Sequence, residues 1–103
     1  MDLYTKTVIQ KAMDDMIIEK GDIIGVLEPF LENIKIESLR DFAIGYLIGG
    51  VKAMGGAFIA AKKLHDKKTD SFTISDEDKH EINQMIIKRL PDILERIGRE
   101  QGR

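Results

Sequence analysis

Apolar side chains recur every three or four residues along most of the chain, a pattern that predicts amphipathic α-helices. The first stripe covers residues 2–20 and consists of Tyr4, Val8, Ile9, Ala12, Met13, Met16 and Ile17. The second covers residues 22–34 and consists of Ile23, Val26, Leu27, Phe30, Leu31 and Ile34. Gly21 is placed to end the first helix, and Asp22 is placed to cap the second. Pro29 removes a backbone donor inside the second pattern, so we expect a kink there or two short helices.

Two capping boxes predict the later helices. Ser38-Leu-Arg-Asp41 begins a third helix that is expected to reach residue 64, and Ser75-Asp-Glu-Asp78 begins a fourth that reaches Ile97. Pro91 should bend this last helix, and the glycines at 98 and 102 predict a frayed tail over residues 99–103. Residues 72–74 have strand-like character but no partner strand. We therefore expect one all-α domain over residues 1–103, a small bundle of about four helices.

The central segment, residues 42–61, reads FAIGYLIGGVKAMGGAFIAA and contains a single charge at Lys52. A helix that is apolar all round is either buried in protein or embedded in a membrane. Its length would suffice to cross a bilayer. However, a lysine at the midpoint costs about 2.5–3.5 kcal/mol on insertion, and glycines replace the large apolar side chains that would offset this cost. The pattern favours burial within protein and no membrane association.

Small residues recur every four positions on this predicted helix. We call them the small-residue ridge: Gly45, Gly49, Ala53, Ala57 and Ala61. Each helical glycine costs about 1 kcal/mol relative to alanine, so a compensating contact is expected. A ridge of small side chains lets another backbone approach closely. The neighbour is either another helix of the same chain or a second copy of this helix. A glycine loop that cradles a ligand is the third alternative, and the sequence leaves all three open.

Composition limits the function classes. The 103 residues are 43% hydrophobic and 33% charged, which excludes intrinsic disorder, and the net charge of −2 excludes a chain built entirely for nucleic-acid binding. The absence of cysteine excludes disulfides and thiol chemistry. Sixteen isoleucines with two prolines and no tryptophan are typical of a heat-adapted or AT-rich source. The charged, amphipathic first fifteen residues lack the apolar core of a secretory signal, so we expect a cytoplasmic protein.

Candidate catalytic and metal motifs are incomplete. The segment around Gly50 and Lys52 lacks the Gly-Lys-Ser/Thr order of a phosphate-binding loop, and residues 66–77 lack the ligand spacing of a calcium loop. Glu77 and His80 have the i, i+3 spacing found in di-metal helical proteins, but such sites need two motifs and further carboxylates. A metal site there would have to be completed across a dimer. No nucleophile has a neighbouring base, so we expect neither catalysis nor a cofactor.

Positive charge is concentrated near the C-terminus, where residues 79–103 have six basic and four acidic side chains. The alternative of an accessory nucleic-acid contact would use this segment through four cations: Lys88, Arg89, Arg96 and Arg99. Interleaved acids and the helix dipole explain the same cations without a nucleic acid. The sequence therefore favours a non-enzymatic interaction protein that self-associates through the small-residue ridge.

Overall fold

The computed structural model describes residues 1–18, 22–68 and 70–101. Within these ranges the chain forms five helices and no strand, so the all-α prediction is confirmed. The number of helices is five rather than about four. They are α1 (Leu3–Ile18), α2 (Ile23–Leu31), α3 (Leu39–His65), α4 (Asp76–Lys88) and α5 (Leu90–Gln101).

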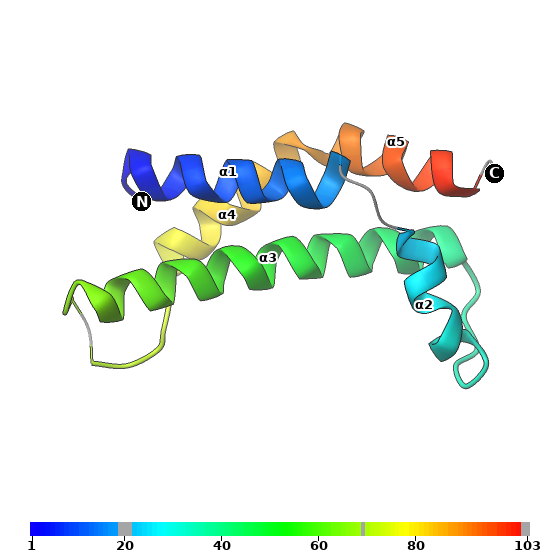
Figure 1. Ribbon diagram of the computed structural model, residues 1–103, viewed down its shortest axis with the longest axis horizontal. Coiled ribbons are helices and arrows are strands. Elements are labelled where there is room, and N and C mark those ends of the chain that lie inside the picture. Colours follow the sequence, from blue (N-terminus) through cyan, green and yellow to red (C-terminus); the bar gives the residue numbers. More distant parts are fainter. Residues whose placement is uncertain (19–21, 69, 102–103) are drawn as a thin grey trace.

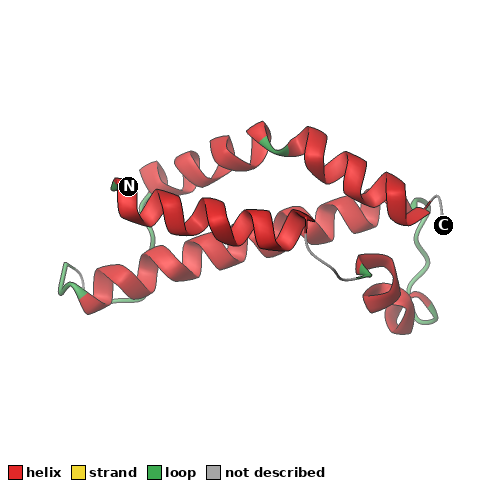
Figure 2. Cartoon of the chain, turned by 45° about the horizontal axis from the view of Figure 1, so that its top comes forward, coloured by secondary structure: helices red, strands yellow, loops and turns green. Residues whose placement is uncertain are grey.

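Three rods form the body of the molecule (Figure 1). The helices α1 and α3 are the first two, and α4 followed by α5 makes a third, bent rod (Figure 2). The short α2 lies beside the N-terminal part of α3 and projects away from the rods (Figure 1). The helix α3 contacts each of the other four helices. The result is an elongated molecule with principal extents of 46 × 27 × 21 Å.

Side-chain caps begin three of the helices as predicted. The Asp22 carboxylate accepts a hydrogen bond from the Gly25 amide at 3.0 Å. The hydroxyl of Ser38 accepts from the Asp41 amide and that of Ser75 accepts from the Asp78 amide, each at 3.1 Å. These bonds satisfy amides that have no partner within the first turn of a helix. The predicted roles of Gly21 and Gly102 fall outside the described residues.

The two prolines act differently from the prediction. Pro29 lies in the last turn of α2, which stays a single nine-residue helix and ends at Leu31, so Ile34 lies beyond it. Pro91 separates α4 from α5 instead of bending one helix, because it occupies the first turn of α5, where its missing N–H is not needed. The helix α5 also continues through Gly98 to Gln101, so residues 99–101 are helical rather than frayed.

The core lies between the three rods and is dominated by isoleucine. Fully buried side chains come from α1, α3, α4 and α5 and include Ile9, Met13, Ile17, Val51, Ile82, Ile93 and Ile97. The helix α2 adds Ile23 and Leu27. The buried positions of α1 and α2 belong to the helical stripes seen in the sequence. Other members of those stripes, Tyr4, Val26 and Phe30, are exposed, so only part of each stripe faces the other rods.

Candidate functional site

The small-residue ridge lies on the surface of α3. All five of its members are exposed, whereas the buried side of α3 is a second row with the same spacing: Ala43, Leu47, Val51, Gly55 and Ile59. The alternative in which the ridge packs against another helix of the same chain is therefore wrong. The larger side chains of the second row bury more apolar area, so that row forms the contact with the core.

Glycines in the two rows have different surroundings. A Cβ built at Gly45 or Gly49 meets no neighbouring group within 4 Å. At Gly55 it would lie 3.4 Å from Ile82 Cδ1, and a Cβ at Gly50 would lie 3.3 Å from a methionine side chain of α1. Close packing within the chain thus explains Gly50 and Gly55 but leaves the two ridge glycines without a compensating contact.

The exposed side of α3 is nearly free of charge. Over residues 42–61 the only charged side chain is Lys52, which is exposed. By length and composition, α3 is the one described helix that could cross a membrane, and 28% of its most apolar window is buried. Tyr46 is 49% exposed, and Val26 and Phe30 on α2 are 54% and 57% exposed. These exposed apolar side chains make this part of the surface a candidate for an interaction site.

The chain also exposes more surface than its mass predicts. Its accessible surface is 6997 Å², whereas a compact monomer of this mass has about 5,900 Å². The radius of gyration is 15.4 Å, compared with about 13 Å for a compact domain of this length. The excess surface, about 1,100 Å², is larger than the roughly 800 Å² that each partner buries in a standard-size interface.

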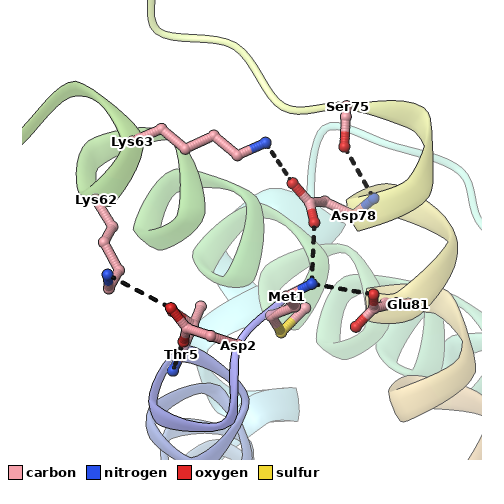
Figure 3. A network of polar contacts seen from close by, with 8 residues as sticks. All are labelled: Met1, Asp2, Thr5, Lys62, Lys63, Ser75, Asp78 and Glu81. Atoms are coloured by element: carbon pink, nitrogen blue, oxygen red, sulfur yellow. Dashed lines mark hydrogen bonds and ion pairs between the residues drawn. The ribbon is translucent and has the colours of Figure 1, made fainter. Parts of the chain in front are cut away.

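A network of charges joins helices at the end of the bundle where α1 begins (Figure 3). The carboxylate of Asp78, a residue only 6% exposed, accepts a hydrogen bond from Lys63 Nζ at 2.5 Å and lies 3.8 Å from the Met1 ammonium. That ammonium donates to Glu81 at 3.2 Å. Burial alone would raise the pKa of Asp78, but hydrogen bonds from Lys63 and Ser75 and the nearby positive charges lower it below 3.8. These paired charges are structural contacts between α1, α3 and α4.

Arg96 and Glu100 of α5 together connect this helix to α1 and α2 from inside the protein. Arg96 is 6% exposed, and its guanidinium donates to the Ile17 carbonyl oxygen at 2.8 Å and to Glu100 at 3.1 Å. The second oxygen of Glu100 accepts from the Ile24 amide at 3.2 Å. This burial corrects the assignment of Arg96 to a nucleic-acid surface. In the sequence, the signal was its position beside the apolar Ile97 and four residues before Glu100.

The other three cations of the nucleic-acid alternative are less buried than Arg96. Lys88 and Arg99 are exposed, and Arg89 makes ion pairs to two helices. Arg89 and Arg99 lie beside carboxylates, which are Asp14, Asp92 and Glu95. Local acids therefore neutralise much of the positive charge that the sequence suggested for this segment.

The weak metal candidates, Glu77 and His80, are both exposed near the start of α4. Among the described residues, no three histidine, aspartate or glutamate side chains come together in a group that could hold a metal ion. A site completed by a second copy remains a prediction. Comparisons of the chain with models of known protein families, with characterised proteins and with solved structures find no match.

Proposed function

We propose that this protein is a non-enzymatic helical assembly protein that self-associates through the small-residue ridge of α3. The observation that carries the proposal is the exposure of all five ridge positions on a helix face with a single charge. Small side chains let two helix backbones approach closely, so the ridge suits a helix from another molecule.

Helix energetics support a partner at the ridge. Gly45 and Gly49 each cost about 1 kcal/mol of helix stability relative to alanine. No neighbouring group of the same chain lies close enough to use the space they leave. A second backbone packed against them would gain dispersion contacts that a larger side chain would prevent. The excess of about 1,100 Å² of surface provides the area that such a contact needs.

Lys52 is compatible with a protein contact in water. It lies about 60° around the helix from Gly49 and about 100° from Ala53, so it borders the ridge. Its long aliphatic stem can cover apolar surface while the ammonium reaches solvent at the edge of an interface. The same lysine at the centre of a bilayer would cost about 2.5–3.5 kcal/mol. We therefore propose assembly in the cytoplasm rather than in a membrane.

The ionisable side chains support a structural role more than a catalytic one. Among the described residues, buried ionisable side chains such as Asp78 and Arg96 hold helices together through ion pairs and hydrogen bonds. The burial of Arg96 also weakens the nucleic-acid alternative, which would have used it together with Lys88, Arg89 and Arg99. A dimer-completed metal site at Glu77 and His80 has no supporting third ligand in the described chain.

The test is the mass in solution of the protein purified without detergent. Sedimentation velocity over a range of concentrations should show a reversible dimer or larger species. Ala53→Glu places a charge at the centre of the ridge and should yield a folded monomer. Gln10→Glu adds the same charge at an exposed position of α1 and should leave the oligomer intact.

A wild-type monomer at every concentration would refute the proposal, as would an Ala53→Glu variant that associates like the wild type. Circular dichroism of each variant checks that helix content is unchanged. Flotation of the wild type with lipid vesicles is the parallel measurement. Stable binding to vesicles in place of self-association would assign the exposed face of α3 to a membrane and would also refute the proposal.

A further inference from the structure

A cavity of about 380 Å³ lies between α1 and α4, and none of its described lining residues belongs to α3. Two methionines form its floor, Met13 of α1 and Met85 of α4, which are 1% and 7% exposed. The side-chain amides of Gln10 and Gln84 line it, one from each helix. The volume lies within the roughly 300–1,000 Å³ of sites for small molecules, which typically combine apolar surface with a few polar groups.

Ion pairs between the two helices fix this cavity at both ends. At one end the Met1 ammonium, close before α1, donates to the Glu81 carboxylate of α4 at 3.2 Å (Figure 3). At the other end the guanidinium of Arg89, directly after α4, donates to the Asp14 carboxylate of α1. These contacts hold the walls of the cavity in place without a ligand, so binding does not have to order the walls first.

Two lysines line the same cavity and have no anionic partner. Within the described chain, the side chains of Lys6 and Lys88 make neither an ion pair nor a hydrogen bond. Lys6 is half-buried on α1, and Lys88 is exposed at the end of α4. The two carboxylates that line the cavity, Asp14 and Glu81, already accept from other cations. An anion in the cavity would therefore give the two ammonium groups the partners that the chain does not provide.

The charges just outside the cavity leave these lysines available. Asp92 pairs with Arg89 from α5, so this carboxylate is also occupied by another cation. His80 lines the cavity, and the exposed Glu77 lies three residues before it. Glu77 is eleven residues from Lys88, a separation of about 16 Å along the helix axis, so it does not serve as the partner of that lysine.

We propose that this cavity binds a small aromatic anion, with its ring on the methionines and its carboxylate or phosphate group held by Lys6 and Lys88. Methionine sulfur makes favourable contacts with aromatic rings, and a lysine ammonium binds either anionic group. The amides of Gln10 and Gln84 can donate or accept hydrogen bonds to polar substituents of the ring. None of the ridge residues lines the cavity, so the inference is independent of self-association.

Titration of the isotope-labelled protein, followed by NMR, tests the site with three matched probes: naphthoate, naphthyl phosphate and the uncharged naphthamide. Chemical shifts should change at the residues of the cavity, namely Gln10, Met13, Gln84 and Met85. At least one of the two anions should bind about tenfold or more tightly than naphthamide, because only an anion forms charge-assisted hydrogen bonds to lysine. Comparison of the two anions identifies the preferred group.

Three lysine variants separate this site from general attraction of an anion to the protein. Lys6→Gln and Lys88→Gln should each weaken binding of the preferred anion about tenfold and leave the affinity for naphthamide nearly unchanged. Lys11→Gln is the matched control, since Lys11 is exposed on α1 about 140° around the helix from Lys6 and should not affect binding. Circular dichroism checks that each variant keeps its helix content.

Three results would overturn the inference. The first is the absence of binding by both anions at millimolar concentration. The second is a set of shift changes confined to the exposed face of α3, which would place the aromatic ring there. The third is equal affinity of Lys6→Gln, Lys88→Gln and Lys11→Gln for the anions, which would exclude the two lysines as the anion-binding groups.

Discussion

The same substitution at two glycines of α3, one in the exposed row and one in the buried row, makes a matched test. Gly49 is an exposed ridge position, and Gly55 lies on the buried side. Replacing either with leucine improves helix propensity by nearly 1 kcal/mol. At Gly49 a new Cβ meets nothing within 4 Å, so the monomer should gain about that amount. Its melting temperature should rise by about 4–8 °C.

At Gly55 the same substitution should be destabilising. The Cβ alone would lie 3.4 Å from Ile82 Cδ1, so the further carbons of leucine would overlap a core side chain. Overpacking of this kind costs about 1–3 kcal/mol. Because the gain in propensity is common to both variants, the difference between their free energies of unfolding isolates the packing cost.

Urea unfolding and thermal melts of both variants measure this difference. The measurements should be made at a dilution where wild type and variants sediment as monomers, since association would add its own stability. Gly55→Leu should melt at least about 4 °C below Gly49→Leu, which corresponds to the lower limit of the packing cost. Equal stability of the two variants would refute the assignment of the buried and exposed rows.

Three further predictions concern a buried ion pair, a helix cap and a titrating carboxylate. Glu100→Ala removes the carboxylate that pairs with the buried Arg96, so it should lower the free energy of unfolding by about 3–5 kcal/mol. A loss below about 1 kcal/mol in urea unfolding would contradict the structural role of the pair. Ser38→Ala removes the cap of α3 and should cost about 1 kcal/mol, whereas Ser38→Asp should retain the stability. The folded state lowers the pKa of Asp78, so its ionised form stabilises the protein above pH 3.8, and this contribution is lost as the pH falls through the folded pKa. Asp78→Asn should therefore be less stable at neutral pH and lose less stability on acidification, and parallel acid-unfolding curves for variant and wild type would contradict this.

Local signals in the sequence were sufficient for most of the secondary structure. The hydroxyls of Ser38 and Ser75 cap their helices because a capping bond depends only on residues three positions apart. The buried positions of α1 and α2 follow from helical periodicity for the same reason. The sequence identified Pro91 as a disruption of the last helix. Whether a proline bends one helix or separates two depends on the packing of the neighbouring residues 89 and 90, and packing is not a local property.

The sequence by itself determined an all-α chain and a long central helix whose small residues recur every four positions. Only the tertiary structure decided which of two rows on that helix faces the core. Both rows have the same spacing, so periodicity could not separate them; the row with Leu47, Val51 and Ile59 is buried because it brings more apolar area to the other rods. The tertiary structure also decided that Arg96 is buried. One of its partners, the Glu100 carboxylate, is local, but the other is the Ile17 carbonyl of α1, which lies far away along the chain. Contacts between distant segments thus left the small-residue ridge exposed and made it the candidate site.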